Sequence, residues 1–210
     1  MKLKIFTLGL LICFSCSILA QEKQSRKSSI GLTFSAINNS RFVNFEREIS
    51  SISNSLSGPS YSVESSNIFG MCYIQPIYSL IDIETGIEYS NRTIEQKIIR
   101  GFMTQTEYNR KDVSYISIPV TARVNFDKYF FLNGGIIFNF EMEKPELIDS
   151  QTGIGAILGI GAKYNLSNEL GVFVNGYYKL HALVPFSEKK DDQRQRLSDI
   201  GLRLGIAYNF

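Results

Sequence analysis

The sequence predicts an all-β protein, an eight-stranded, antiparallel, up-and-down transmembrane β-barrel. Three observations support this fold class. Apolar residues alternate with small or polar ones over segments long enough to cross a bilayer as strands. Tight turns alternate with long polar connections, and the sequence ends on an aromatic strand residue, Phe210. Lipid outside and a polar lumen inside produce this period of two.

Residues 201–210 show the alternation clearly. One face of this strand carries Gly, Arg, Ala and Asn, and the other face is apolar throughout. A C-terminal Phe also resembles the signal that bacterial outer-membrane barrels present to their insertion machinery, so we expect this strand to complete the barrel. The apolar face consists of Ile200, Leu202, Leu204, Ile206, Tyr208 and Phe210.

Residues 1–20 have the features of a cleaved signal peptide. Lys2 and Lys4 precede an apolar run that ends at Ala20 and is short for a membrane-spanning helix. We therefore expect residues 1–20 to be removed and residues 21–210 to form the barrel domain. The formal charge of +2 then falls to zero. This argues against nucleic-acid binding, because phosphate recognition needs a marked basic excess.

Seven further segments alternate over a length suited to a membrane-spanning strand, which gives eight with the C-terminal strand. An even number lets an antiparallel barrel close without a free edge, as lipid demands because unpaired backbone groups are costly there. The second segment is the least regular, because Ile68, Ile74 and Tyr78 interrupt its polar face. The segments are residues 28–37, 67–79, 83–94, 113–126, 128–141, 153–166 and 169–182.

The connections between these segments alternate in length. Three are tight, at residues 80–82, around Asp127 and at 167–168. Those after the first, third, fifth and seventh segments are long and polar. Outer-membrane barrels have short periplasmic turns and longer outward loops, so the pattern predicts both termini in the periplasm. A soluble barrel such as a lipocalin would bury its apolar face inward and gives no reason for this alternation.

The fourth segment carries a motif that runs through Tyr115, Ile116, Ser117, Ile118, Pro119 and Val120, with Arg123 and Asn125 after it. Together with the aromatic C-terminus, the motif resembles that of the PorT-type, OmpA-like outer-membrane β-barrel families of Bacteroidetes. The resemblance implies a small barrel in the outer membrane of a Gram-negative cell. PorT itself is tied to the type IX protein secretion apparatus, so the resemblance also implies a secretion accessory as one function.

Pro119 lies inside this motif, where proline removes a backbone donor from the strand ladder. We expect a β-bulge or a locally opened register there, facing the lumen. A role of Pro119 in shaping a site is the alternative.

Charged residues on the inward faces are predicted to fill the lumen. Eight strands leave a bore just wide enough for side chains, and buried charges persist only when they are paired and hydrogen-bonded. We therefore expect a plug of ion pairs. A narrow polar conduit is the alternative and would require a gap in that plug. The residues are Glu84, Glu88, Arg92, Arg123, Glu141, Lys163, Glu169, Lys179 and Arg203.

His181 is the only histidine and alternates with the inward-facing residues. Some eight-stranded outer-membrane barrels modify lipid A with a rim His–Ser pair, in which the Ser lies two residues from the His on the lipid side. Here that position is Leu183, so the sequence does not support an enzyme. A lone His and, in the mature segment, a lone Cys72 indicate neither a metal site nor a cofactor.

Two polar segments are expected at the outer surface. Residues 38–65 are rich in serine, and residues 188–196 mix acidic and basic side chains. Solvated loops explain both, and contact with lipopolysaccharide phosphates or docking of a partner is the functional alternative. The residues expected to make such contacts are Lys189, Lys190, Arg194 and Arg196.

Together these features predict an integral outer-membrane protein that is not an enzyme. It has a plugged polar lumen and a structural, adhesive or envelope-assembly role. Its expected partners are outer-membrane lipid, lipopolysaccharide and envelope or secretion-machine proteins. The alternatives are an accessory component of the type IX secretion machine, a lipid A-modifying enzyme and a small pore.

Overall fold

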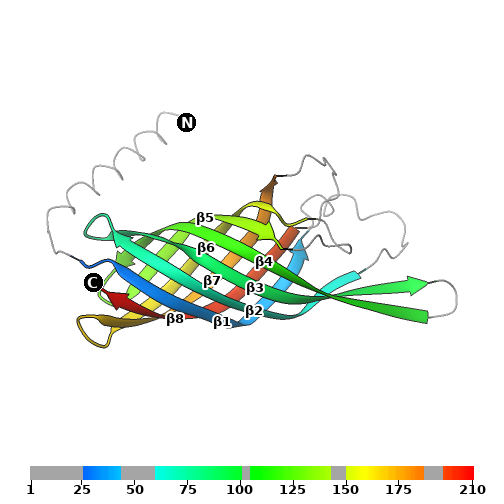
Figure 1. Ribbon diagram of the computed structural model, residues 1–210, viewed down its shortest axis with the longest axis horizontal. Helices are drawn as coiled ribbons and strands as arrows, with labels where there is room; N and C mark the ends of the chain where they lie inside the picture. Colours follow the sequence, from blue (N-terminus) through cyan, green and yellow to red (C-terminus); the bar gives the residue numbers. More distant parts are fainter. Residues whose placement is uncertain (1–25, 44–59, 101–104, 143–149, 187–195) are drawn as a thin grey trace, which may run out of the picture.

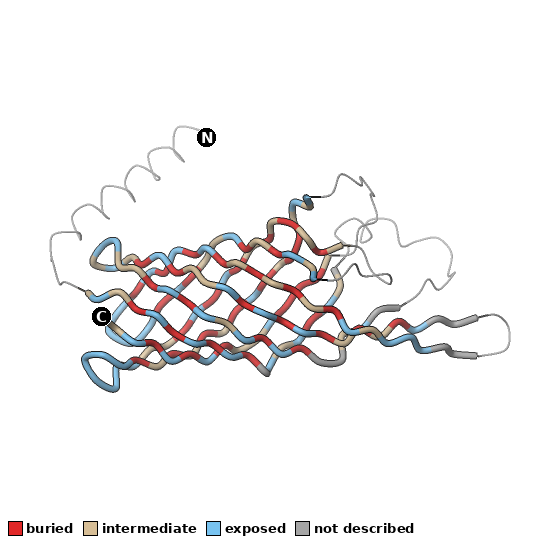
Figure 2. The backbone as a smooth tube through the Cα atoms, viewed as in Figure 1, coloured by how far each residue is buried: buried red, intermediate tan, exposed pale blue. Residues whose placement is uncertain are grey.

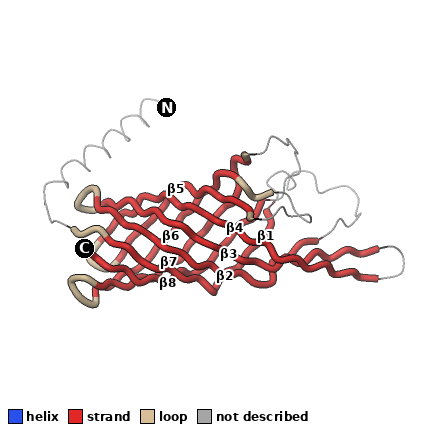
Figure 3. Tube along the Cα trace, viewed as in Figure 1, coloured by secondary structure: helices blue, strands red, loops and turns tan. Residues whose placement is uncertain are grey.

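Eight antiparallel strands form one closed barrel (Figures 1 and 3). The computed structural model describes residues 26–43, 60–100, 105–142, 150–186 and 196–210, so the expected signal peptide lies outside the described residues. Each strand pairs with the next along the chain, and β1 pairs with β8. The strands are β1 (Ser29–Val43), β2 (Ser60–Pro76), β3 (Ile81–Arg100), β4 (Gln105–Phe126), β5 (Phe130–Glu141), β6 (Gly153–Asn165), β7 (Leu170–Pro185) and β8 (Arg196–Asn209).

The predicted fold class and the positions of all eight strands are confirmed. The tight connections and the C-terminus lie at one end of the barrel, which we call the turn end, and the opposite end is the loop end (Figure 1). None of the described residues forms a helix long and apolar enough to span a membrane.

The polar segment after the third predicted strand is a hairpin, which corrects the expectation of a long loop. β3 and β4 run past the rest of the barrel at the loop end, and only residues 101–104 separate them (Figure 1). Arg110 Nε donates to Glu95 Oε2 over 3.0 Å, and Thr93 Oγ1 donates to Asp112 Oδ1 over 2.7 Å. Hydropathy alternation could not reveal this part, because both faces of its strands carry polar residues.

The turn between β2 and β3 starts earlier than the sequence suggested. Pro76 is the last residue of β2, and Ile77 and Tyr78 both donate their backbone N–H groups to the carbonyl of Ile81. Asp82, expected in the turn, is therefore the second residue of β3 and is buried in the lumen.

The outer and inner faces of the wall differ in polarity. Outward side chains such as Leu32 (65% exposed) and Leu158 (64% exposed) are apolar, whereas most buried side chains are polar or charged. Figure 2 shows this alternation of buried and exposed positions along every strand. A soluble barrel has the opposite arrangement, so the lipocalin-like alternative is wrong.

The apolar outer band ends near Tyr89, whose hydroxyl lies 3.1 Å from Ser114 Oγ on β4. Beyond this pair the outward positions of the hairpin carry Thr93, Glu95 and Arg110. Tyrosine is common where a barrel wall passes from lipid to water. The hairpin therefore projects from the membrane-facing wall into an aqueous environment.

Two irregularities interrupt the alternation of buried and exposed side chains. A register shift between Phe34 and Ile37 of β1 brings Asn38 inward. On β7, residues 181–183 lie opposite a single residue of β6, and Ala182 has a left-handed φ of 46°. A non-glycine residue in this conformation costs about 1–2 kcal/mol, and here it allows His181 and Ala182 both to be buried.

Pro119 is buried on the lumen side of β4, but it causes no bulge. The register between β3 and β4 is the same on both sides of it, at Thr85↔Val120 and Glu88↔Ser117. The hydroxyl of Thr85 donates to the carbonyl of Pro119 over 3.0 Å. The ladder is thus opened locally without the extra residue that a bulge requires.

Leu158→Arg tests the lipid-facing assignment of the wall. Leu158 lies near the middle of β6 and points outward, so an arginine there should cost about 2–4 kcal/mol of unfolding free energy in lipid vesicles. In Asn91→Arg, beyond the apolar band, the cost should be about 1 kcal/mol or less. Urea titration of vesicle-folded protein measures both, and equal costs at the two positions would contradict the assignment.

Candidate functional site: the polar lumen

Glu84 lies at the centre of the lumen between two arginines from opposite sides of the barrel. Arg203 Nη2 on β8 donates to Glu84 Oε1 over 2.7 Å, and Arg123 Nε on β4 lies 3.3 Å from Glu84 Oε2. All three side chains are almost completely buried. A single carboxylate therefore ties three strands together across the bore.

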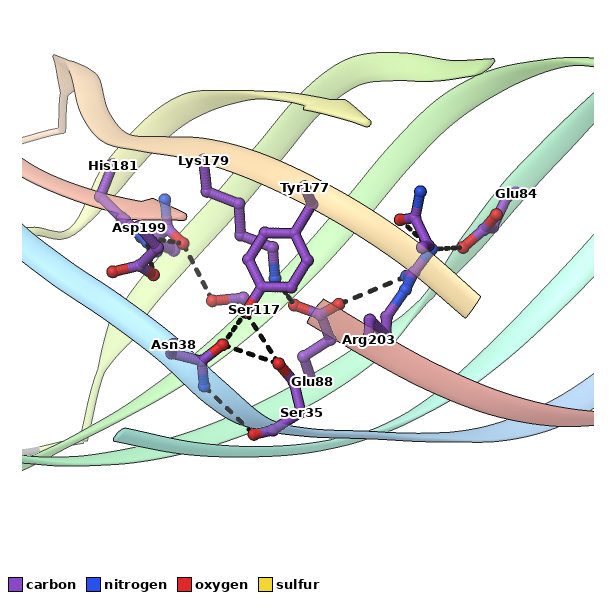
Figure 4. Close-up of polar contacts among 12 residues, drawn as sticks. Ser35, Asn38, Glu84, Glu88, Ser117, Tyr177, Lys179, His181, Asp199 and Arg203 are labelled. Atoms are coloured by element: carbon purple, nitrogen blue, oxygen red, sulfur yellow. Dashed lines mark hydrogen bonds and ion pairs between the residues drawn. The ribbon is translucent and has the colours of Figure 1, made fainter. Parts of the chain in front are cut away.

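Glu88, four residues further along β3 on the same face, continues this network. Lys179 Nζ on β7 donates to Glu88 Oε2, and Arg203 Nη1 lies 3.6 Å from Glu88 Oε1 (Figure 4). We call Glu84, Glu88, Arg123, Lys179 and Arg203 the central charge layer. Sequence reasoning had placed all five in the lumen, and the structure brings them into contact.

Aromatic rings cover the arginines of this layer. The guanidinium carbon of Arg123 lies 3.7 Å from the ring centroid of Phe131 and 5.0 Å from that of Phe173, and Arg203 lies 5.6 Å from the Phe173 ring. The rings attract the cations through their negative faces and exclude water from them. The layer is therefore both paired and shielded.

A second polar cluster lies toward the loop end and is built on Asp199 of β8. Arg92 donates to Asp199 through Nη1 over 3.1 Å and through Nη2 over 2.6 Å, and His181 Nε2 lies 2.8 Å from Asp199 Oδ2. His181 Nδ1 lies 3.0 Å from Asn139 Oδ1. Arg92 and Asp199 thus form a bidentate salt bridge, in which one positive charge pairs with one negative charge. We call this group the loop-end polar cluster.

Sequence reasoning missed Asp199. It alternates with Gly201 and Arg203 on the inward face, but the predicted strand covered residues 201–210, whereas β8 begins at Arg196. Extending the period of two by one step would have placed Asp199 in the lumen.

Tyr177 crosses the lumen between the two clusters. Its hydroxyl donates to Asn38 Oδ1 and lies 3.0 Å from Ser35 Oγ, so β7 contacts β1 without a shared ladder (Figure 4). Asn38 in turn donates to the Ser66 carbonyl on β2 over 3.0 Å.

A third group lies at the turn end. Arg26 Nη2 is 2.8 Å from Asp82 Oδ1, and Asn125 Nδ2 donates to Asp82 Oδ2 over 2.7 Å. Lys163, a predicted lumen residue, donates to Asn125 Oδ1 and is only half-buried. These contacts fix the rim of the barrel and do not extend the central layer.

Apolar clusters enclose the polar ones at both ends. Toward the turn end, Phe131 precedes Asn133 on β5 and Phe173 precedes Asn175 on β7. Toward the loop end, Ile94 follows Arg92 on β3. The turn-end cluster consists of Cys72, Ile74, Phe131, Phe173 and Ala207, and the loop-end cluster of Ile94, Val113 and Tyr115 with Phe42 against it. Apolar side chains thus flank the charged clusters toward both ends of the barrel.

Glycines on the inner wall make room for the rings. A Cβ atom at Gly161 of β6 would lie 2.3 Å from Phe131 Cζ, and one at Gly205 of β8 would lie 2.2 Å from Phe173 Cζ. The absence of a side chain at these two positions is therefore what lets the turn-end apolar cluster close over the arginines.

Two predicted members of the lumen network lie elsewhere, which corrects the prediction. Glu169 is exposed in the turn between β6 and β7, because the strand starts only at Leu170. Glu141 ends β5 at the loop end, where it accepts from Ser150 Oγ over 2.6 Å and from the backbone N–H of Gln151. It closes the β5–β6 connection and not the central layer.

The predicted outer-loop contacts are only partly visible. Lys189, Lys190 and Arg194 lie outside the described residues, and Arg196 is the first residue of β8 and half-buried.

His181 is buried in the lumen beside Asp199 and does not face the lipid. Within the described parts of the chain, no group of three or more His, Cys, Asp and Glu side chains is placed to hold a metal ion. Glu84, Glu88 and Asp199 each contact two buried side chains from other strands, so the lumen residues contribute to cohesion between strands.

An apolar outer wall around an ion-paired interior defines a transmembrane β-barrel. Solved structures similar in fold include the outer membrane protein OprG from Pseudomonas aeruginosa (11% identity, 88% of this chain and 96% of that chain, TM-score 0.47). They also include Ail from Yersinia pestis (15%, 89% and 100%, TM-score 0.38) and AlkL (11%, 91% and 92%, TM-score 0.41). No protein-family model matches the chain, and no curated protein matches its sequence.

Glu84→Gln tests how far stability depends on the central layer. The amide keeps the shape but removes the charge that pairs Arg123 with Arg203, so the unfolding free energy should fall by about 3–5 kcal/mol. Glu169→Gln, on the exposed turn, should change it by no more than about 0.5 kcal/mol. Urea titration in detergent compares them, and similar values for both would show that the layer contributes no net stability.

Proposed function

We propose that this chain is an integral protein of the Gram-negative outer membrane whose barrel is a closed, non-catalytic anchor for a surface-exposed hairpin. The observation that carries the proposal is the central charge layer, in which β3 is tied to β4, β7 and β8 across the bore. Apolar clusters on both sides of the charged residues support it, because apolar side chains are unfavourable neighbours for hydrated ions. These features favour an anchor over a pore.

The positions of the ends support the orientation. Short turns face the periplasm in outer-membrane barrels and longer elements face outward. The β3–β4 hairpin would then stand in the lipopolysaccharide head-group layer or beyond it, with its charged outward side available to partners or to lipid phosphates. A structural, adhesive or envelope-assembly role follows from this arrangement.

A non-catalytic role is favoured over lipid A modification by the position of His181. A lipid-modifying His–Ser pair must reach the bilayer, whereas His181 is engaged with Asp199 and Asn139 inside the barrel. Its bonds orient β7 against β5 and β8.

The second candidate function is an accessory role in type IX secretion. It rests on the motif Tyr115 to Val120, in which Pro119 faces the lumen and opens the β3–β4 ladder locally. An accessory of a secretion machine would meet its partners mainly at the periplasmic turn end, whereas an adhesive or surface-assembly protein would meet them at the hairpin.

Ion conductance tests the closed anchor. The purified protein should migrate faster on detergent gels when unboiled, fractionate with the outer membrane, and give no stepwise current in planar bilayers. The reason is that ion pairs and apolar clusters fill the bore. A porin reconstituted in the same way is the positive control. Uniform current steps from the heat-shifting species would overturn the closed lumen in favour of a pore.

Site-specific cross-linking separates the two candidate roles. Tyr108 is 56% exposed on the hairpin and Tyr78 is 60% exposed in a turn at the opposite end, so a photo-reactive phenylalanine fits both positions equally. Irradiation of whole cells should give protein or lipopolysaccharide adducts at position 108. Adducts confined to position 78 would support the secretion accessory and contradict the surface role.

A further inference from the structure

The central charge layer carries one positive charge more than it can pair. Three cations, Arg123, Lys179 and Arg203, face two carboxylates, Glu84 and Glu88. All five residues are 4% exposed or less. At such buried positions, an unpaired charge is expensive unless a counter-charge lies nearby. The aromatic faces over Arg123 attract it, but a ring quadrupole is weaker than a full negative charge.

Hydrogen-bond donors in this layer are left without an acceptor. Within the described residues, Arg123 Nη2, Arg203 Nε and Asn133 Nδ2 are buried and have no hydrogen-bond acceptor. Glu84 Oε2 and Glu88 Oε1 also make no hydrogen bond, but each lies in an ion pair, 3.3 Å from Arg123 Nε and 3.6 Å from Arg203 Nη1. Asp82, the register partner of Arg123 on β3, is engaged by Arg26 and Asn125. The spare donors on Arg123 and Asn133 therefore call for an acceptor-only species.

The chain of hydrogen bonds from Arg203 through Asn175 to Asn133 determines which way the unsatisfied Nδ2 of Asn133 points. Arg203 can only donate, so it gives Nη2–H to Asn175 Oδ1 over 3.2 Å. Asn175 Nδ2 then donates to Asn133 Oδ1 over 3.1 Å. The amide nitrogen of Asn133 is therefore turned away from Asn175. Asn133 is also the direct register partner of Arg123 across β4 and β5.

These contacts form a ring through the lumen. It runs from Glu84 to Arg203, Asn175 and Asn133, and returns through Arg123 to Glu84. Only the step from Asn133 to Arg123 lacks a side-chain hydrogen bond. The unsatisfied donors of these two residues lie on neighbouring strands at directly paired positions.

We propose that the barrel holds one small monovalent inorganic anion, such as chloride, between Arg123 and Asn133. A single negative charge balances the surplus of one, and an anion that only accepts satisfies Arg123 Nη2 and Asn133 Nδ2 together.

The anion acts as a structural part of the folded barrel. Because the residues around it are buried, the anion enters with folding and leaves with unfolding. A ligand that binds only the folded state lowers the unfolding equilibrium constant in proportion to its free concentration once above its Kd. The inference does not depend on what the hairpin binds.

The first measurement is reversible urea unfolding of the detergent-folded barrel in sodium chloride and in sodium bromide, with gluconate keeping the ionic strength constant. One anion per chain predicts a tenfold fall in the unfolding equilibrium constant for each tenfold rise in halide. Bromide retained by the folded protein after gel filtration, counted by elemental analysis, should approach one per chain. An unfolding constant independent of halide, or no retained bromide, would overturn the site.

Asn133→Asp is the decisive variant because it supplies the missing charge in place. Its Oδ1 can still accept from Asn175, and its second oxygen takes the position of the amide donor beside Arg123. We expect a higher urea midpoint than wild type in gluconate, loss of the halide dependence and no retained bromide. Asn91→Asp, on the exposed outer side, should leave both properties as in wild type. Halide dependence that persists unchanged in Asn133→Asp would refute the assignment to this site.

Discussion

The structure depends on the closure of the strands in a setting where backbone groups have no water to bond. Lipid requires every N–H and C=O of the wall to pair with a neighbouring strand, and the ring from β1 to β8 meets this requirement. In a barrel that closes in lipid, polar and apolar side chains lie on the opposite sides from those in a soluble protein. Apolar side chains cover the outside, and eight strands leave a bore that side chains themselves must fill.

The buried charges of the interior are stabilised by ion pairs that aromatic rings cover. Glu84 and Asp199 each accept from more than one partner, so two carboxylates hold β3, β4, β7 and β8 together. Phe131 and Phe173 then close over the arginines, which is possible because glycine faces each ring from the neighbouring strand. Charge pairing and ring packing are thus parts of one arrangement, since the rings exclude the water that would weaken the ion pairs.

Alternation made the wall predictable, because a period of two assigns each residue to lipid or lumen without knowledge of contacts. Glu84, Arg123 and Arg203 were identified this way. The method failed where a strand boundary was misplaced, as for Asp82 and Asp199, and where a β-strand was polar on both faces, as in the hairpin. It also could not give the partners of a lumen residue, because cross-bore pairs depend on the stagger of strands that are distant in sequence. The bulge at Ala182, which buries a residue that alternation assigns to the lipid side, left no signal in the pattern.

The rigidity of this interior bears on where function can lie. Side chains that bridge the bore and are sealed by rings cannot rearrange without unpairing buried charges, and each such step costs several kcal/mol. Such an interior holds the ends of the strands in fixed positions, as the anchor role proposed above requires. The hairpin of β3 and β4 is the described element that extends past the band of lipid contact, and its ion pair between Glu95 and Arg110 is exposed and weak. Recognition by this protein is therefore expected there, on charged side chains that a partner can engage at little cost to the fold.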